Sequence, residues 1–126
     1  MGARVLVVDD DESIRNIVTL FLSDEGYEVL AVAHGQAALD VLDRFPPDVI
    51  LLDLRMPVMD GWEFARLYRE RPPPHAPIVA FAAALNVAQD SAGVDAAGIL
   101  AKPFDLEELL LAVRAQLPSP SPYAKT

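Results

Sequence analysis

Acidic side chains and one lysine stand at the ends of short apolar runs in this sequence. Asp9 and Asp10 follow the run RVLVV, and Asp53 follows the run DVILL. Lys102 follows the run ILA, whereas a further run, PIVAF, leads into Ala82 and two more alanines. In a parallel sheet the carboxyl ends of the strands meet at one edge, where such sheets form their sites. We therefore expect these side chains to gather at a single site.

A cluster of carboxylates of this kind needs cations. Carboxylates at one edge repel one another, and burying them without partners is costly. Lys102 supplies one positive charge, and aspartate oxygens together with backbone carbonyls and water suit octahedral Mg²⁺. A carboxylate beside Mg²⁺ and a lysine is suited to phosphoryl transfer, because the two cations neutralise the phosphoryl oxygens while the carboxylate attacks in line. The product of this chemistry is an aspartyl phosphate.

The apolar runs belong to an alternation of strand and helix patterns. Apolar, β-branched runs predict five strands, at 4–8, 27–32, 48–52, 77–82 and 99–101. Apolar residues at helical spacing follow each run, with a cap at Asp11 for the first helix and a capping box at Asp105 and Glu108 for the last. The prolines that begin at Pro46 are expected to end the second helix, and the pattern within 84–98 is the weakest. This alternation predicts an α/β fold in which helices cover both faces of a parallel sheet.

Composition and charge restrict the class of protein. The 126 residues suffice for one domain with its own core, and 52% hydrophobic with 23% charged residues is typical of a globular chain. The formal charge of −9 disfavours direct binding of nucleic acid. The absence of cysteine excludes disulfides and thiolate metal sites, which suits a reducing, cytoplasmic setting. No apolar run reaches membrane-spanning length, so no membrane partner is expected.

Three blocks of the sequence carry a family resemblance. VLVVDDDESIR, DVILLDLRMPVMDGWEF and ILAKPF resemble, in this order, the receiver domains (CheY-like) of two-component response regulators. The resemblance covers residues 4–117 and implies a doubly wound, flavodoxin-like (βα)5 fold, with a five-stranded parallel sheet in the order 2-1-3-4-5. We expect a receiver domain at 1–117 and a Pro/Ser-rich flexible tail, or the start of a linker, at 118–126.

The resemblance also implies a role for each residue at the strand ends. Asp53 would accept a phosphoryl group from a histidine kinase or a histidine phosphotransfer protein, and Lys102 would contact that group. Mg²⁺, with Mn²⁺ as a substitute, would be bound by Asp10, Asp53 and the Arg55 carbonyl, and by Asp9 through water. The other implied positions are the phosphoryl-side backbone of Ala82 and Ala83, the loop residues Pro57 and Gly61, and Pro103, whose peptide bond with Lys102 would be cis.

Two positions depart from the family pattern. Ala82 stands where receivers carry Ser or Thr, whose hydroxyl binds a phosphoryl oxygen, and Ile99 stands where they carry Tyr or Phe. In the family these two groups form a coupled switch. A charge-assisted hydrogen bond of this kind is worth roughly 1–3 kcal/mol, and alanine cannot make it. The resulting hypothesis is a receiver that is phosphorylated but signals by another route, through its loops or through altered affinity for its donor.

Other functions remain open from the residues alone. One is a protein-interaction module with a retained acidic pocket that binds partners regardless of phosphate; the missing switch groups favour it, and the complete acidic site opposes it. Another is a Mg²⁺-dependent phosphatase with an aspartyl nucleophile, but Arg55 occupies the position of its general acid. Flavodoxin-like cofactor binding fits the topology, yet no Gly/Ser/Thr-rich phosphate loop follows the first strand. The leading prediction is a signalling domain and not an enzyme, catalysing only its own phosphorylation and slow dephosphorylation.

The expected partners follow from that prediction. They are the phosphodonor and either a downstream protein target or a C-terminal output domain that this chain does not contain. We expect a monomer or a weak homodimer. Trp62, which opens the third expected helix, is interpreted as a packing residue. The Arg55 side chain is interpreted either as a gate for attacking water or as an exposed loop residue.

Overall fold

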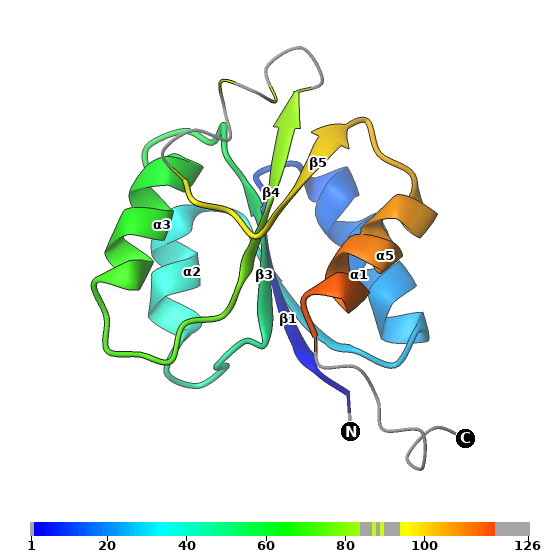
Figure 1. Cartoon of the computed structure of the whole chain (residues 1–126), viewed down its shortest axis with the longest axis horizontal. Coiled ribbons are helices and arrows are strands. Elements are labelled where there is room, and N and C mark those ends of the chain that lie inside the picture. Colours follow the sequence, from blue (N-terminus) through cyan, green and yellow to red (C-terminus); the bar gives the residue numbers. More distant parts are fainter. Residues whose placement is uncertain (1, 84–86, 88, 90–93, 118–126) are drawn as a thin grey trace.

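Five parallel strands form one sheet through the middle of the molecule (Figure 1). The computed structural model describes residues 2–83, 87, 89 and 94–117. The strands are β1 (Arg4–Val8), β2 (Glu28–Val32), β3 (Val49–Asp53), β4 (Ile78–Ala83) and β5 (Gly98–Lys102). They lie in the order β2-β1-β3-β4-β5, and every neighbouring pair is parallel. The predicted sheet and its strand order are confirmed.

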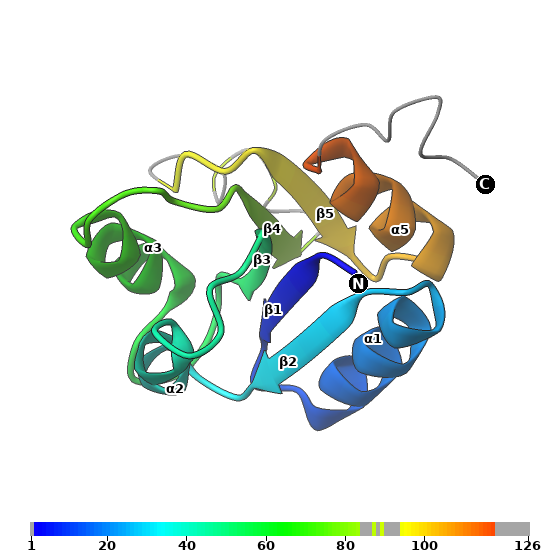
Figure 2. The same ribbon diagram turned by 90° about the horizontal axis from the view of Figure 1, so that it is seen from below.

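Helices cover both faces of the sheet, as the alternation of patterns predicts. The described helices are α1 (Glu12–Asp24), α2 (Gly35–Val41), α3 (Gly61–Arg69) and α5 (Leu106–Ala115). Figure 2 shows α2 and α3 on one face of the sheet and α1 and α5 on the other. Most of the segment predicted as a further helix, 84–98, and all of the predicted tail, 118–126, lie outside the described residues. None of the helices in the described part of the chain has the length and hydrophobicity to span a lipid bilayer.

The central strands β1 and β3 supply the core on both faces of the sheet. Alternate residues of a strand point to opposite faces, so a strand covered on both sides is apolar throughout. Leu6 and Ile50 pack with Phe64 in the core between the sheet and the α2–α3 layer. Val7 and Leu51 pack in the core on the α1–α5 side. All five side chains are fully buried, which fixes β1 and β3 and therefore the acidic residues at their carboxyl ends.

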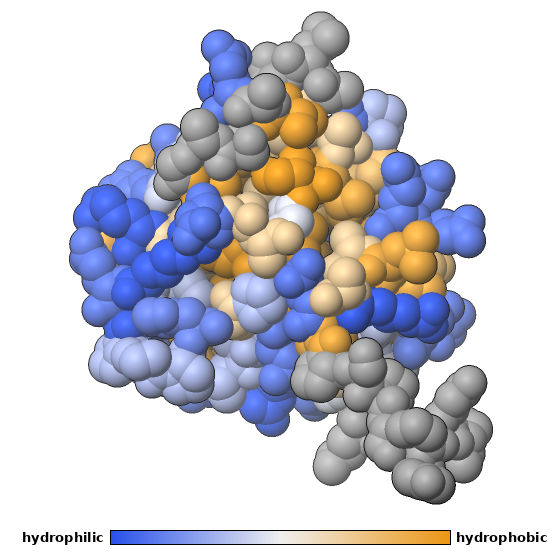
Figure 3. All heavy atoms as spheres, viewed as in Figure 1, coloured by the Kyte–Doolittle hydropathy of each residue, from blue (hydrophilic) through white to orange (hydrophobic). Residues whose placement is uncertain are grey.

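One face of the molecule carries apolar side chains over the strands β4 and β5 (Figure 3). On the face seen in Figure 3 they gather over β4 and β5, between the helix layers, whereas hydrophilic side chains cover α3. Ile99, in the middle of β5, is partly buried and packs against the core of the α2–α3 side. This position of β5 is therefore filled by a packed aliphatic side chain.

The predicted starts of the first and last helices are confirmed by their caps. Asp11 Oδ1 accepts hydrogen bonds from the backbone N–H groups of Ser13, at 2.9 Å, and Ile14, at 3.2 Å. Asp105 and Glu108 form the predicted capping box at the start of α5. An uncapped helix start leaves backbone N–H groups without partners. The cap at Asp11 thus fixes the start of α1 directly beside the acidic strand end.

Some element boundaries differ from the prediction. α2 ends at Val41, well before the prolines. Beyond Val41 the chain forms hydrogen bonds of the 3₁₀ type, from residue i to residue i−3, such as that from Arg44 N to Val41 O at 3.2 Å. The strands β3, β4 and β5 extend by one residue, to Asp53, Ala83 and Lys102. These residues are therefore held in the sheet and do not lie in the loops that follow.

Candidate functional site

The carboxyl end of β3 is the centre of the site, because β3 lies between β1 and β4. In the register of the sheet, the last residue of β1 pairs with the residue before Asp53, so Asp9 begins its loop beside Asp53. Lys102, the last residue of β5, pairs with Ala83 at the end of β4. Strand order and register alone thus bring Asp9, Asp53 and Lys102 to one edge of the sheet.

Lys102 bridges the two buried carboxylates. Its Nζ lies 3.0 Å from Asp9 Oδ2 and 3.5 Å from Asp53 Oδ2. Asp9 is fully buried and Asp53 is 6% exposed. The Lys102 ammonium also lies 5.8 Å from the centre of the Phe81 ring, which Phe104, two residues after Lys102, contacts as well. One ammonium therefore compensates two buried negative charges, which its single charge cannot fully neutralise.

The other carboxylate oxygens are held by backbone donors. The Asp11 N–H donates to Asp9 Oδ1 at 2.9 Å, and the Arg55 N–H donates to Asp53 Oδ1 at 3.3 Å. The guanidinium of Arg15 reaches back from α1 to the Asp9 carbonyl at 2.9 Å. Among the described residues, every buried side-chain nitrogen and oxygen has a hydrogen-bond partner. The acidic cluster is therefore rigidly positioned before any ligand is present.

Burial changes the ionisation of these groups. Desolvation, reinforced by the charge of Asp9, raises the pKa of Asp53 from its ordinary 3.8 to about 7, although Lys102 and the Arg55 N–H favour the ionised form. Burial acts to lower the pKa of Lys102, but its hydrogen bond to Asp9 and the two carboxylate charges outweigh this and leave it raised. Lys102 is therefore a permanent cation at neutral pH, whereas Asp53 gains its full charge there only with help from a further cation.

The donor set of the site fits a hard divalent cation. Asp9, Asp10 and Asp53 each offer a carboxylate oxygen, and these oxygens lie within 4.8 Å of one another. Asp10 is exposed, so its side chain is open to solvent, whereas the other two are buried. Oxygen ligands, with positions left for water, are what Mg²⁺ prefers, and thiolate and imidazole ligands are absent from this cluster. The residues present thus suit Mg²⁺ at this edge.

The loop between β3 and α3 shapes one wall of the site. The Gly61 N–H donates to the Leu54 carbonyl at 2.9 Å. A Cβ at Gly61 would lie 2.6 Å from Leu54 Cα and 2.8 Å from the Asp53 carbonyl oxygen, so only glycine allows this approach. Pro57 lies in the same loop, and on the opposite wall the peptide bond between Lys102 and Pro103 is cis.

Val58, in the same loop, has a left-handed backbone, with φ of 70°, and its side chain is fully exposed. A β-branched residue is strained in this conformation, and its exposed side chain gains nothing from burial. We expect Val58→Gly to raise the free energy of unfolding by about 0.5–1 kcal/mol, because relief of strain exceeds the added entropy of the unfolded chain. Urea titration would measure this. Val58→Ala, which keeps a Cβ, should gain less, and a loss of stability with glycine would contradict the expectation.

The structure brings most of the predicted site residues into one pocket. The predicted residues that line it are Asp10, Asp53, Arg55, Ala82, Ala83 and Lys102, and the helix cap Asp11 lines it as well. Ile99 does not belong to this lining. Ala82 is buried and its side chain is only a methyl group, while Ala83 is exposed. The lining of the pocket therefore includes acids, an arginine and a lysine but no hydroxyl side chain.

Sequence reasoning missed several supporting residues. Arg15 holds the Asp9 carbonyl from α1, and Phe81 lies under the Lys102 ammonium. The guanidinium of Arg55 lies 5.2 Å from the centre of the Trp62 ring. Arg15 stands six residues after Asp9 and one helical turn into α1, a spacing that suggests its direction. No pattern in the sequence signals the other two contacts, because the first depends on the register of β4 and β5 and the second on how the β3–α3 loop returns to the sheet edge.

A sheet in the order 2-1-3-4-5 with an acidic cluster and a lysine at its carboxyl edge defines the class of receiver domains. The response regulator receiver domain family matches residues 5–114, and the chain belongs to this family. Receiver domains are signalling domains that interact with histidine kinases and with output domains, and they typically bind Mg²⁺ at an acidic pocket. The resemblance found in the three sequence blocks is confirmed.

Known relatives agree with this assignment. The chain is 41% identical to the response regulator MprA of Mycobacterium sp. (strain KMS), over 97% of this chain and 54% of that protein. The MprA of Mycobacterium tuberculosis (strain CDC 1551 / Oshkosh) is also 41% identical, over 93% of this chain and 51% of that protein. The chain thus spans about half the length of these relatives.

Solved structures share the fold. The chemotaxis response regulator CheY4 of Vibrio cholerae is 38% identical, with a TM-score of 0.84, and the match covers 93% of this chain and all of CheY4. A putative response regulator from Chloroflexus aurantiacus is 31% identical, with a TM-score of 0.83, over 91% of this chain and 97% of that one. NtrX from Brucella abortus, at 28% identity and a TM-score of 0.85, matches over 93% of this chain but 27% of its own length. The fold therefore occurs both alone and as part of longer proteins.

Proposed function

We propose that Asp53 of this receiver domain accepts a phosphoryl group from a histidine kinase or a histidine phosphotransfer protein in a Mg²⁺-dependent reaction. One carboxylate oxygen of Asp53 faces the Lys102 ammonium, and the other accepts the Arg55 N–H. The carboxylate attacks the phosphorus, the bond to the donor's nitrogen breaks, and the donor's histidine leaves neutral after taking up a proton. Bound Mg²⁺ would neutralise charge on the transferring group, held by Asp10, Asp53 and the Arg55 carbonyl, with Asp9 acting through water.

The observation that carries this proposal is that the two buried acids, Asp9 and Asp53, differ in their burial and in their contacts with Lys102. Lys102 lies nearer to Asp9, at 3.0 Å, than to Asp53, at 3.5 Å. Asp9 is fully buried and bonded at both carboxylate oxygens, so it is poorly placed to attack an incoming phosphorus atom. Asp53 lines the pocket and retains some exposure. Of the two, Asp53 is the accessible nucleophile.

Incubation with acetyl phosphate, a small phosphodonor, tests this proposal. In the presence of Mg²⁺ we expect the intact mass to increase by one phosphoryl group. The adduct should be absent in EDTA, because without a divalent cation the negative charges of the acidic cluster repel the incoming phosphoryl group. Mn²⁺ should restore the adduct. Mg²⁺ alone should also raise the melting temperature, since a ligand that binds only the folded chain stabilises it. An adduct that forms equally well in EDTA would contradict the proposal.

A second candidate function rests on Ala82 and Ile99. Ala82 is buried without a hydroxyl, and Ile99 is packed into the core on the α2–α3 side, so the coupled switch of the family has neither of its parts. These observations favour a domain that binds its partners in the same way with and without phosphate. Partner affinity measured for the free and the beryllofluoride-treated protein separates the two functions. Equal affinities would favour the phosphorylation-independent module, and a difference would favour signalling by an unusual route.

A further inference from the structure

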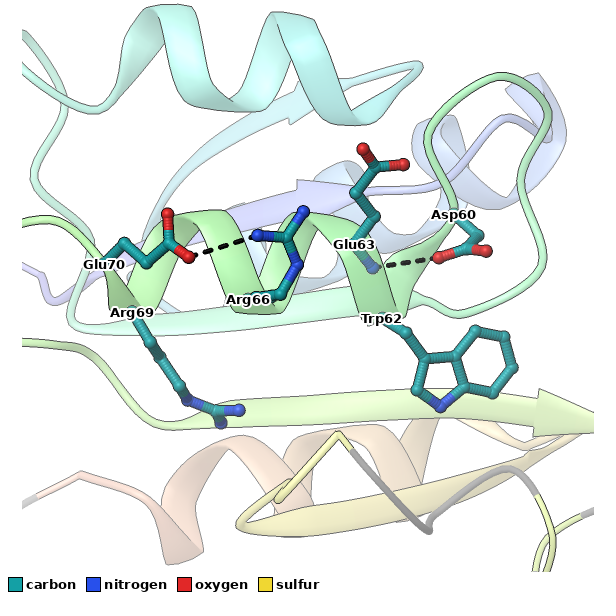
Figure 4. A pocket seen from close by; sticks show the side chains of 6 residues that line it. All are labelled: Asp60, Trp62, Glu63, Arg66, Arg69 and Glu70. Carbon is teal, nitrogen blue, oxygen red and sulfur yellow. Dashed lines mark hydrogen bonds and ion pairs between the residues drawn. The ribbon is translucent and has the colours of Figure 1, made fainter.

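Arg55 and Trp62 form a contact that joins the acceptor loop to the first turn of α3. The Arg55 guanidinium carbon lies 5.2 Å from the centre of the indole ring, a distance typical of cation–π interactions. The α3 start is well fixed, because Asp60 Oδ1 accepts the Glu63 N–H at 2.9 Å (Figure 4). Trp62 is partly buried and packs against the core of the α2–α3 side. The ring is therefore a firm support for a guanidinium on an otherwise exposed side chain.

The supported arginine belongs to the acceptor pocket. Arg55 lies two residues after Asp53, donates its backbone N–H to Asp53 Oδ1, and lines the pocket together with Ala82 and Lys102. An arginine side chain is long and flexible, and it loses considerable rotamer freedom when it is fixed in place. Stacking on Trp62 already restricts the rotamers of Arg55 before any ligand binds, so less conformational entropy is lost on binding.

Lys102 alone cannot compensate the negative charge of a phosphorylated pocket, so a second cationic side chain is needed. A phosphoryl group on Asp53 adds negative charge beside Asp9 and Asp10, whereas Lys102 is already bonded to Asp9 at 3.0 Å. The side chain of Ala82 offers no hydrogen-bond donor, so at this position only backbone groups are available. Arg55 and Lys102 are the cationic residues that line this pocket in the described part of the chain. The planar guanidinium presents several donors in a fork that matches phosphoryl oxygens.

We propose that Trp62 is a positioning residue that holds the Arg55 guanidinium at the mouth of the acceptor pocket, where it donates to the phosphoryl group in place of the hydroxyl that Ala82 lacks. This inference rests on the proposed phosphorylation of Asp53. It gives the indole a role beyond packing: the ring acts through Arg55 and does not touch the phosphoryl group.

Binding of beryllofluoride, a non-transferring analogue of the phosphoryl group, tests the inference. We would titrate it in saturating Mg²⁺, follow binding by fluorine NMR, and compare the wild type with Arg55→Ala, Trp62→Leu, Trp62→Phe and the double variants. Arg55→Ala should weaken binding roughly tenfold, the value of a lost charge-assisted hydrogen bond. Trp62→Leu should weaken it roughly threefold, and Trp62→Phe, which keeps an aromatic face, should lose less. In the Arg55→Ala background neither Trp62 substitution should have a further effect.

The outcomes separate this inference from the proposed function. If the wild type does not bind beryllofluoride with Mg²⁺, the proposed function fails. If the wild type binds and Arg55→Ala binds equally well, or if Trp62→Leu weakens binding as much without Arg55 as with it, the positioning role is wrong. Thermal melts establish which variants are folded. If Trp62→Leu is not, the comparison of Trp62→Phe in the two backgrounds decides, because it keeps a ring in the same place.

Discussion

Asp53→Asn is expected to stabilise the folded chain at neutral and higher pH in the absence of Mg²⁺. Burial and the charge of Asp9 raise the pKa of Asp53 to about 7 in the folded state, against 3.8 for an ordinary aspartate. The folded chain therefore binds the Asp53 proton more tightly than the unfolded chain does. The stabilisation from this protonation is fully present below about pH 4 and is lost as the pH rises through about 7. Asparagine keeps the shape of the side chain without the charge.

The measurement is urea unfolding of both proteins in EDTA between pH 5 and pH 8. The stability difference in favour of the variant should grow by roughly 2–3 kcal/mol between pH 5 and pH 8. Asp40→Asn, at an exposed position on α2, is the matched control and should show no comparable growth with pH. A variant that is less stable than the wild type at pH 8 would show that the Asp53 carboxylate is not under electrostatic strain.

Lys102→Met is expected to have the opposite effect on stability. It removes the ammonium that lies 3.0 Å from Asp9 and 3.5 Å from Asp53, while the methionine keeps most of the aliphatic volume beside Phe81. Asp9, which is fully buried, is left without its cation, and removing one partner of a buried pair is strongly destabilising. We expect a loss of roughly 2–4 kcal/mol at pH 8 without Mg²⁺, and much slower formation of the acetyl phosphate adduct.

Arg114→Met provides the control for this loss. Arg114 pairs with Glu25 at 3.5 Å, but its side chain is 57% exposed, so its removal should cost less than about 0.5 kcal/mol. A second feature distinguishes the two variants. Mg²⁺ should restore part of the stability lost in Lys102→Met, because a divalent cation compensates the same acids, and it should do nothing for Arg114→Met. Equal losses in the two variants would contradict the central place given to Lys102.

The residues at the strand ends were predictable from the sequence for a physical reason. A parallel strand covered on both faces has to be apolar throughout, so Asp9 and Asp53 are visible as the points at which such runs stop. Parallel order then brings the carboxyl ends to one edge whatever the details of the loops. The caps at Asp11 and Asp105 were equally visible, because a helix start requires a side-chain acceptor at a fixed spacing.

Other features of the site were not predictable, because they depend on side-chain distances and loop conformations that residue spacing does not determine. The preference of Lys102 for Asp9 over Asp53 is a difference between 3.0 Å and 3.5 Å, and the proposal of Asp53 as the acceptor depends on it. The contact between Arg55 and Trp62 depends on how the β3–α3 loop folds back. The left-handed backbone of Val58 is also hidden, since a valine gives no signal for it. At Arg55 and Val58, a loop that is fixed by tertiary contacts overrides local preference.

Location of the phosphoryl group is the measurement that tests the central claim most directly. After reaction with acetyl phosphate and Mg²⁺, reduction with borohydride converts an aspartyl phosphate into homoserine, and peptide mass spectrometry then locates the changed residue. We predict homoserine at position 53, with no conversion in Asp53→Asn or in EDTA. Homoserine at Asp9 or Asp10, or a phosphoryl adduct that persists in Asp53→Asn, would show that the geometry around β3 does not select the acceptor.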